Sequence, residues 1–329
     1  METVAAPRMV PGYRHKPGNH CGSTALRNLL AHHGVEISEE MALGLGAGVS
    51  FYYVPMEGQS PSRFTNGRAG KLEAQFIELT EAPIVLETFE DPEASWEAAR
   101  AVVDSGRSAI LLTDLYYLDH YGRSARFPGH AVVLAGYDSE VAYLSDTGFE
   151  DLQTTRLESL ARARHGRHPL FPLEGHMLTL PEGAEIGEVR EAADRAIGRN
   201  AQQMLDPPMG EYEGLPALRR FASEVGDWPQ ELDDWQWCAR FCYQVIERRG
   251  TGGGNFRLMY SRFLREVQDE HAGLAAEAAA GWTSLAAALL AASESDEPTP
   301  GLWSPVRAEA ARVLDAEERL WPALTGRSP

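Results

Sequence analysis

The hydrophobic pattern of the chain changes at Pro181, and this change limits the fold more than any other feature of the sequence. Before this point, short apolar runs bounded by turn residues predict buried strands at 108–118, 130–138, 141–147 and 175–181. After it, stretches rich in Ala, Leu, Glu and Arg with helical periodicity cover 184–205, 214–225, 229–249, 254–271, 272–293 and 303–320. The 329 residues are enough for two domains of ordinary size. We therefore predict an α+β domain over 1–181 followed by an all-α helical domain over 182–329.

Cys21 opens the segment CGSTALRNLLAHHG, in which apolar residues recur at helical spacing and Gly34 is a typical helix stop. The first turn of a helix favours the thiolate form of a cysteine through its partial positive charge and free amides, and the thiolate is the nucleophile. Gly22 leaves room for a substrate carbonyl, and the Cys21 amide can donate to an oxyanion. The side chain of Asn19 or His20 is our candidate for the second donor.

His130 begins a predicted strand directly after Pro128 and Gly129, where its ring can project from the sheet edge toward a helix terminus. Asp146 ends the next predicted strand, and a hairpin pairing would bring its carboxylate near the other ring nitrogen. Each residue taken alone is more often structural. The order of Cys-helix, His-strand, turn and Asp-strand is nevertheless that of papain-like enzymes. The sequence therefore predicts a papain-like domain with Cys21 as nucleophile, His130 as base and Asp146 as orienting carboxylate.

Residues 44–70 (GLGAGVSFYYVPMEGQSPSRFTNGRAG) are rich in Gly, Ser and Pro, with aromatic residues between them. This composition suits a long ordered loop beside a site better than a regular element. We expect the loop to face the substrate, and its candidate substrate-binding residues are Phe51 and Tyr52.

The sequence GTGGGN at 250–255 precedes a predicted helix. Its amides, including those of Gly252 and Gly253, can hold a carboxylate or phosphate together with the helix dipole and Arg257. A simple helix-start loop is the alternative, since glycine runs also serve sharp chain reversal. The loop lacks the terminal Lys-Ser/Thr of a nucleotide P-loop, so ATP is not implied.

His120, in YYLDHYG, lies close to His130 in sequence. We expect it to line the pocket together with Asp119, and the two are the reserve candidates if His130 proves structural. The stretch RLESLARARHGRHP (156–169) concentrates four arginines and two histidines on an acidic protein. It is our candidate for docking an acidic carrier domain or a phosphopantetheine phosphate, and a solvated surface helix is the alternative.

Composition and charge exclude several classes of protein. The 30 basic and 48 acidic residues give a formal charge of −18, which makes nucleic acid an improbable partner. The N-terminus has no apolar signal region, and the sequence contains no uncharged run of 18 residues that could span a membrane. We therefore expect a cytoplasmic protein. We expect no metal, because Cys238 and Cys242 have no second ligand pair and suit a helical core. The Ala-rich helical surfaces favour a homodimer.

Four motifs, in this order, resemble the family of the butirosin biosynthesis acyltransferase: HCGSTALRNLL (20–30), GLGAGVSFYY (44–53), FPGHAVVLAGYDSEVAYLSD (127–146) and RRGTGGGNFRLMYSRFL (248–264). The resemblance spans nearly the whole chain. It implies a cysteine-peptidase-like N-terminal domain and a helical C-terminal domain, with Cys21, His130 and Asp146 as the matching catalytic positions. Leader peptidases share the HAVVLAGYD strand, but the glutamine expected several residues before their cysteine is missing from MVPGYRHKPGNHC.

The resemblance further implies acyl transfer in natural-product biosynthesis without a bound cofactor. A thioester on an acyl carrier protein, through its phosphopantetheine arm, would acylate the cysteine, and an amine of a small molecule would take the acyl group. Release by an internal nucleophile would make the enzyme a cyclase. Two alternatives remain: a cysteine hydrolase or peptidase, which admits water to the acyl-enzyme, and a non-catalytic binding protein on a papain-like fold. The presence of all three catalytic residue types favours an enzyme.

Overall fold

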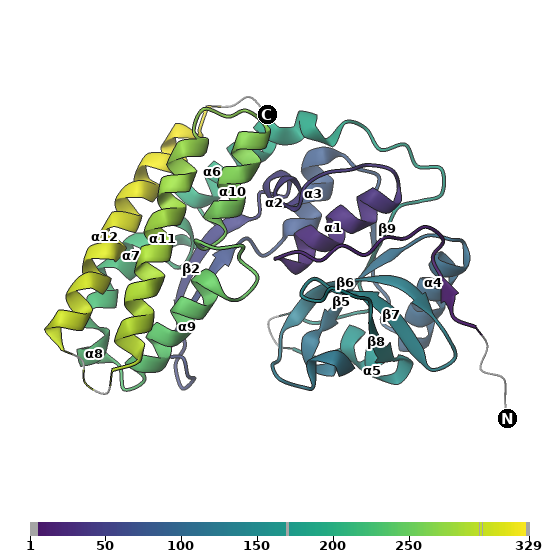
Figure 1. The fold of residues 1–329 in the computed structure, drawn as a ribbon, viewed down its shortest axis with the longest axis horizontal. Helices are drawn as coiled ribbons and strands as arrows, with labels where there is room; N and C mark the ends of the chain where they lie inside the picture. Colours follow the sequence, from purple (N-terminus) through teal and green to yellow (C-terminus); the bar gives the residue numbers. More distant parts are fainter. Residues whose placement is uncertain (1–5, 169–170, 296, 298, 327–329) are drawn as a thin grey trace. The chain divides into compact units, whose positions relative to one another are not determined.

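The structure is a computed structural model that describes residues 6–168, 171–295, 297 and 299–326 (Figure 1). The chain forms two compact units, Met1–Ala42 with Glu81–Gly187, and Leu43–Thr80 with Glu188–Pro329. These units differ from the predicted linear ranges because the segment 43–80 packs with the helices of the second unit. Pro169, the last residue of the arginine-rich stretch, lies outside the described residues.

Within the described residues, the first unit contains a seven-stranded sheet of order β4-β9-β5-β6-β7-β8, to which β1 adds beside β6. The pairings are antiparallel. The strands are β1 (Arg8–Met9), β4 (Val85–Glu87), β5 (Ala109–Asp114), β6 (Pro128–Tyr137), β7 (Val141–Ser145), β8 (Gln153–Arg156) and β9 (Met177–Thr179). The four predicted strands are confirmed as β5, β6, β7 and β9. β5 ends four residues before the predicted end, because two 3-10 turns, η1 (Leu115–Tyr117) and η2 (Asp119–Tyr121), follow it.

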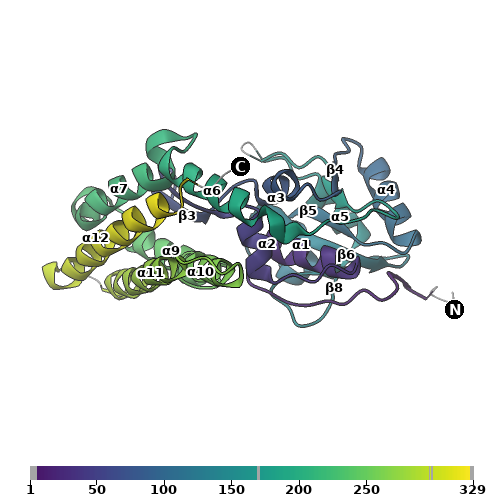
Figure 2. The ribbon, with the colours of Figure 1, turned by 90° about the horizontal axis from the view of Figure 1, so that it is seen from above.

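Helices cover this sheet (Figure 2). They are α1 (Cys21–His32), α4 (Pro92–Asp104) and α5 (Leu157–Arg164), and α2 (Glu39–Leu45) begins in the first unit. Alternate residues of the central strands, Leu111, Val132 and Leu144 among them, form one core with α4 and α5. α1 contacts β6 and β5. A helix that starts at Cys21 therefore lies along the strand that carries His130.

The second unit is helical and includes one two-stranded hairpin (Figure 1). Its helices are α3 (Leu72–Thr80), α6 (Ala193–Leu205), α7 (Gly214–Glu224), α8 (Trp228–Glu231), α9 (Trp235–Glu247), α10 (Arg257–Glu266), α11 (Ala272–Ser293) and α12 (Pro300–Ala323). The six predicted helical stretches are confirmed, with the first and third each beginning in a shorter helical turn.

The expected long loop at 44–70 is wrong, because this segment folds into β2 (Val49–Pro55) paired with β3 (Arg63–Arg68). Its run VSFYYVP is rich in β-branched and aromatic residues, which suit a half-buried strand. Val49, Phe51 and Tyr53 are buried, whereas Tyr52 is partly exposed. Of the Gly, Ser and Pro residues that suggested a loop, Gly58, Ser60, Pro61 and Ser62 lie in the turn between the two strands, and the others lie in α2, in the strands or beside them.

One helix among the described residues, α11, is long and apolar enough to cross a membrane by length and composition. Its contacts are those of a core helix, because it packs against α12, α9 and α10. Trp282, Leu285 and Leu289 on this helix are fully buried. Core helices of soluble proteins pass the same test, and 39% of the apolar window of α11 is buried.

Candidate active site

Cys21 is the first residue of α1, as the sequence predicted. His20 is the N-cap residue in extended conformation, and its Nδ1 accepts a hydrogen bond from the Ser23 amide at 3.3 Å. Cys21 is 8% exposed, so its thiol lies just beneath the surface. Cys21 and Gly22 are the first two residues of the helix, where backbone amides point out of its N-terminal end, as expected of oxyanion donors.

The Glu39 carboxylate fixes the backbone immediately before the cysteine. It accepts hydrogen bonds from the Asn19 amide at 2.9 Å and the His20 amide at 2.7 Å, and its second oxygen accepts from Asn19 Nδ2 at 3.1 Å. A Cβ at Gly18 would lie 2.2 Å from Thr24 Oγ1 and 2.7 Å from Glu39 Oε2, so only glycine fits there. The candidate donors Asn19 and His20 are therefore held in place by Glu39, which the sequence analysis did not identify.

His130 lies on β6, beside Thr113 of β5, whose hydroxyl donates to the His130 carbonyl at 2.9 Å. The imidazole is buried, and its Nε2 is 2.9 Å from Asp146 Oδ1. The same ring is hydrogen-bonded to the Cys21 side chain. The structure thus brings together the three residues that the sequence predicts as nucleophile, base and orienting carboxylate.

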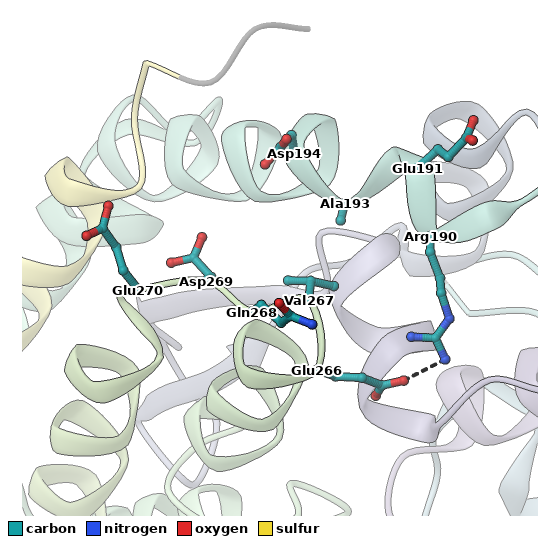
Figure 3. Close-up of a pocket in the computed structure, with 9 residues that line it drawn as sticks. All are labelled: Arg190, Glu191, Ala193, Asp194, Glu266, Val267, Gln268, Asp269 and Glu270. Atoms are coloured by element: carbon teal, nitrogen blue, oxygen red, sulfur yellow. Dashed lines mark ion pairs between the residues drawn. The ribbon is translucent and has the colours of Figure 1, made fainter.

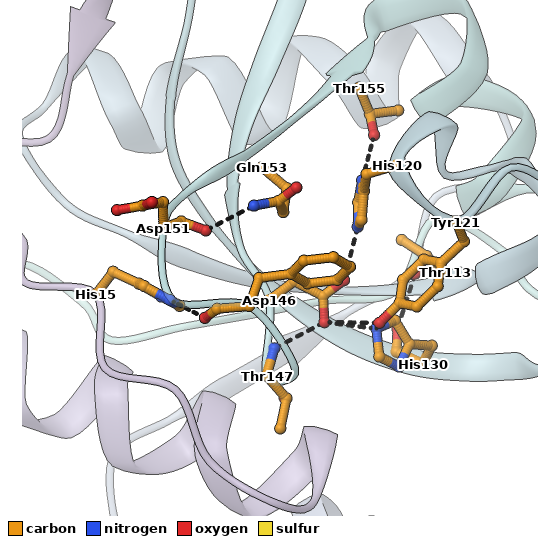
Figure 4. Close-up of polar contacts among 11 residues, drawn as sticks. His15, Thr113, His120, Tyr121, His130, Asp146, Thr147, Asp151, Gln153 and Thr155 are labelled. Carbon is orange, nitrogen blue, oxygen red and sulfur yellow. Dashed lines mark hydrogen bonds and ion pairs between the residues drawn. The ribbon is translucent and has the colours of Figure 1, made fainter. Parts of the chain in front are cut away.

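Asp146 directly follows β7 and is fully buried. Besides His130, it accepts hydrogen bonds from the Tyr121 hydroxyl at 3.3 Å and from the Thr147 amide at 2.7 Å, all at Oδ1. Its other oxygen, Oδ2, is 2.8 Å from His120 Nε2. Figure 4 shows His120 and His130 reaching this one carboxylate from different directions. The four donors replace the water that a buried carboxylate loses.

The electrostatics of the site favour a charged imidazole. Burial lowers the pKa of His130, but the charge of Asp146 and the hydrogen bonds with Asp146 and Cys21 outweigh burial and raise that pKa to about 10. Burial raises the pKa of Asp146, but the charge of His130 and the hydrogen bonds from His120 and His130 hold it well below its usual range. Burial and the Asp146 charge raise the pKa of Tyr121, so its hydroxyl remains a neutral donor. An imidazolium beside a carboxylate is therefore the favoured state at neutral pH.

The two aromatic candidates, Phe51 and Tyr52, lie in the second unit. Phe51 is 1% exposed and packs on Phe221 and Trp282, with ring centroids 5.6 and 5.1 Å apart. The Tyr52 hydroxyl donates to Glu213 Oε1 at 2.6 Å. Phe51 is therefore a core residue of the second unit, and Tyr52 is tied to a neighbouring helix start.

The glycine loop turns into α10 with Gly252 and Gly253 at positive φ, and the Gly253 amide donates to Thr251 Oγ1 at 3.1 Å. Arg257 is fully buried and forms an ion pair with Glu317, with Nε 2.6 Å from Oε1 and Nη2 3.1 Å from Oε2. These partners within the chain favour the alternative stated for this loop, a helix start rather than an anion site.

The arginine-rich stretch forms α5 and the residues after it. Arg164 is a core residue, because it is buried and donates to the carbonyls of Ser95 and Gly175, both at 2.9 Å. The remaining arginines line two neighbouring hollows of about 280 and 720 Å³. Their basic side chains are Arg123, Arg126, Arg156, Arg162, Arg167, His165 and His168. These side chains form a basic face of the first unit, in which Arg156 pairs with Asp119, Arg126 with Asp114 and Arg162 with Glu158.

The other two cysteines differ from Cys21. Burial raises the pKa of the Cys242 thiol to about 12, and burial also raises the pKa of Cys238. Both lie on α9, and all three cysteines are free thiols. Within the described residues, no group of three or more His, Cys, Asp or Glu side chains is arranged to hold a metal ion. Cys238 and Cys242 are therefore packing residues.

The second unit contains a pocket of about 590 Å³ that is rich in carboxylates (Figure 3). Its charged lining residues are Arg190, Glu191, Asp194, Glu266, Asp269 and Glu270. Arg190 pairs with Glu266 at 2.8 Å. The lining residues include no thiol, hydroxyl or imidazole, and the Cys-His-Asp group, which is the candidate active site, lies in the first unit.

The fold and site define a class: a protein with a sheet-containing N-terminal region and a helical C-terminal region, carrying a Cys-His-Asp group at a helix start. Residues 20–147 match the family model described as butirosin biosynthesis protein H, N-terminal, and residues 158–324, half of the chain, match a domain of unknown function, DUF4872. The chain therefore carries the N-terminal domain of the butirosin biosynthesis protein H family followed by a DUF4872 domain, which confirms the resemblance to that family. None of the curated proteins compared with the chain matches it. Family membership indicates a biosynthetic enzyme of antibiotic production.

Proposed function

We propose that the chain is a cysteine-dependent acyltransferase of natural-product biosynthesis, built on a papain-like domain. The observation that carries the proposal is the continuous contact from Cys21, at the first turn of α1, through His130 to Asp146. A buried imidazolium beside a thiol at a helix start favours the thiolate and supplies a proton donor. The free cysteines suit a reducing cytoplasm.

The reaction divides into two transfers at Cys21. The thiolate attacks the carbonyl carbon of a thioester, and the Cys21 and Gly22 amides face the developing oxyanion. The His130 imidazolium protonates the departing thiol as the carbon–sulfur bond breaks, which leaves an acyl-enzyme. An amine then attacks the acyl carbon, neutral His130 takes its proton, and the new amide forms as the Cys21 thiolate leaves.

The acyl donor in this proposal is a phosphopantetheine thioester, free or on an acyl carrier protein. The basic face supports it, because Arg162 and Arg167 line its larger hollow and Arg167 has no carboxylate partner among the described residues. A phosphate or an acidic carrier surface would find complementary charge there. The acceptor is an amine of a small molecule, or an internal nucleophile if the product is cyclic. No bound cofactor enters these steps, and we propose a homodimer through the Ala-rich helices.

Intact-protein mass spectrometry after incubation with a panel of acyl-pantetheine thioesters tests the proposal. We expect a single acyl adduct on the unmodified protein and none on Cys21→Ala, whereas Cys242→Ala, the matched loss of a core thiol, keeps the adduct. Addition of an amine panel should then remove the adduct as amide product. Release only as free acid at saturating amine would instead establish a hydrolase. A protein without an adduct and with an unreactive Cys21 would be a binding protein.

A further inference from the structure

The carboxylate of Asp146 is hydrogen-bonded to two histidines, and the proposed chemistry uses only one of them. His130 occupies Oδ1 at 2.9 Å and His120 occupies Oδ2 at 2.8 Å. The His120 side chain is 6% exposed and the Asp146 side chain 0%, so this second contact is buried as deeply as the first. His120 was expected to line the substrate pocket, but it lies on the far oxygen of Asp146.

The hydrogen bonds of His120 fix its tautomer. A carboxylate can only accept, so His120 Nε2 must carry the proton that it shares with Asp146. The other ring nitrogen, Nδ1, is 3.1 Å from Thr155 Oγ1 on β8, and a neutral ring accepts the hydroxyl proton there. Both ring nitrogens of His120 therefore have hydrogen-bond partners.

Packing fixes the plane of the same ring. The His120 ring is tilted against Tyr121 at 4.8 Å and edge-on to Phe149 at 5.2 Å between centroids. The neighbouring Asp119 is turned toward the Arg156 side chain, with 3.1 Å between Oδ2 and Nε. The titratable groups that face the His120 ring are therefore Asp146 and Tyr121, with His130 beyond the carboxylate.

We propose that His120 is a positioning residue, which holds Asp146 Oδ2 so that Oδ1 stays in line with His130 Nε2 and the His130 ring stays on Cys21. Without His120, the carboxylate can rotate about its Cβ–Cγ bond, and Oδ2 loses its only side-chain donor among the residues that the structure describes. The contacts run from Thr155 through His120, Asp146 and His130 to Cys21. This inference rests on the proposed role of Cys21 as nucleophile.

The rate of Cys21 alkylation by iodoacetamide between pH 5 and 10 tests this inference without any substrate. The variants are His120→Ala, which removes the donor, His120→Gln, whose Nε2 can still donate to Asp146, and Thr155→Val, which removes the outer hydroxyl. His32→Gln is the matched control, since His32 contacts the Gly106 carbonyl and not Asp146. Circular dichroism and thermal melting confirm that each variant is folded.

We expect His120→Ala to move the alkylation profile about one pH unit upward, so that the rate falls about 10-fold at pH values below the thiol pKa, where one unit in that pKa removes about nine-tenths of the thiolate. His120→Gln should restore most of the rate, Thr155→Val should fall between them, and His32→Gln should match the unmodified protein. If His120→Ala does not fold, the remaining variants decide the question.

The inference would be overturned if the pH profiles of folded His120→Gln and Thr155→Val both superimpose on that of the unmodified protein. The His120→Ala profile must then also be unchanged, wherever that variant folds. A folded His120→Gln as slow as His120→Ala would also overturn the inference, since the donated hydrogen bond would then not matter. An unreactive Cys21 in the unmodified protein would overturn the nucleophile assignment as well. Alkylation that depends on His120 without any acyl adduct would overturn the proposed function alone.

Discussion

Asp146→Asn is the sharpest single test of the charge arrangement in the site. The substitution keeps the shape of the side chain but removes the charge that contributes most to raising the pKa of His130 from 6.5 to about 10, to which Cys21 also contributes. That difference corresponds to about 5 kcal/mol between the charged and neutral imidazole. Without the carboxylate, burial remains as the largest influence and lowers the pKa of His130, so the imidazolium is lost at neutral pH.

The expected consequence is a change in the pH profile of Cys21 alkylation. Without an imidazolium the thiol titrates near its ordinary pKa of about 8.5, so the rate with iodoacetamide at pH 6 should fall by up to about 300-fold. The rates of the two proteins should converge above pH 9, where both cysteines are thiolates. Asp151→Asn is the matched control, because Asp151 is exposed on the same unit. A folded Asp146→Asn protein whose rate at pH 6 stays within twofold of the unmodified protein would refute the reasoning.

The same pKa values predict how stability depends on pH. The raised pKa of His130 contributes stability that is complete below about pH 6.5 and is lost as the pH rises through about 10. The lowered pKa of Asp146 contributes stability that is present above about pH 4 and is lost as the pH falls through the folded-state value. Thermal melting of the unmodified protein should therefore decline from pH 7 to pH 10 more steeply than that of Asp146→Asn. Parallel declines would contradict the assignment.

Three further predictions concern the supports of the site and of the fold. Glu39→Gln should lower the free energy of unfolding by about 2 kcal/mol and slow alkylation of Cys21, because the oxygens that hold the preceding amides lose their charge, whereas the exposed Glu36→Gln should change neither. Arg257→Met should cost about 3–5 kcal/mol in urea unfolding by leaving Glu317 buried and unpaired, and a second change, Glu317→Leu, should recover part of that loss. A fragment that ends at Gly187 keeps every catalytic group but should aggregate in size-exclusion chromatography, because the residues that bury Phe51 lie in 188–329. A soluble fragment with a cooperative melt would contradict this reading of the second unit.

The sequence predicts the parts of this protein that depend on local pattern. The start of α1 at Cys21, the strand at His130 and the Asp146 that follows β7 all come from periodicity and turn residues within a few positions of each other. The prediction of a long loop at 44–70 is wrong because it rests on the composition of the whole stretch rather than on its individual runs. Gly58, Ser60, Pro61 and Ser62 belong to the turn between the strands, whereas β2 taken alone is rich in β-branched and aromatic residues, which favour a strand.

The hydrogen bonds of Glu39 and His120, which local sequence patterns do not predict, join residues far apart in the sequence. Glu39 bonds to Asn19, twenty positions away, and nothing around Glu39 signals a carboxylate that serves another helix. His120 was recognised as lying near His130 in sequence, but its partner is Asp146, 26 positions away. These pairings arise only when α2 approaches α1 and the η2 turn folds over the end of β7. Local propensity does not determine such contacts.

The burial of the site explains why so many donors converge on two carboxylates. A charged group taken out of water costs several kcal/mol unless hydrogen bonds replace the solvent. Asp146 is compensated by donors from β6, from the η2 turn and from its own following amide. Two of its side-chain donors, His120 and Tyr121, come from one 3-10 turn. Opening of that turn would expose Asp146 and uncouple it from His130, so the charge on the imidazole depends on a segment that touches no substrate atom in the proposed reaction. Amide exchange in 119–121 should therefore vary together with Cys21 reactivity across the His120 variants.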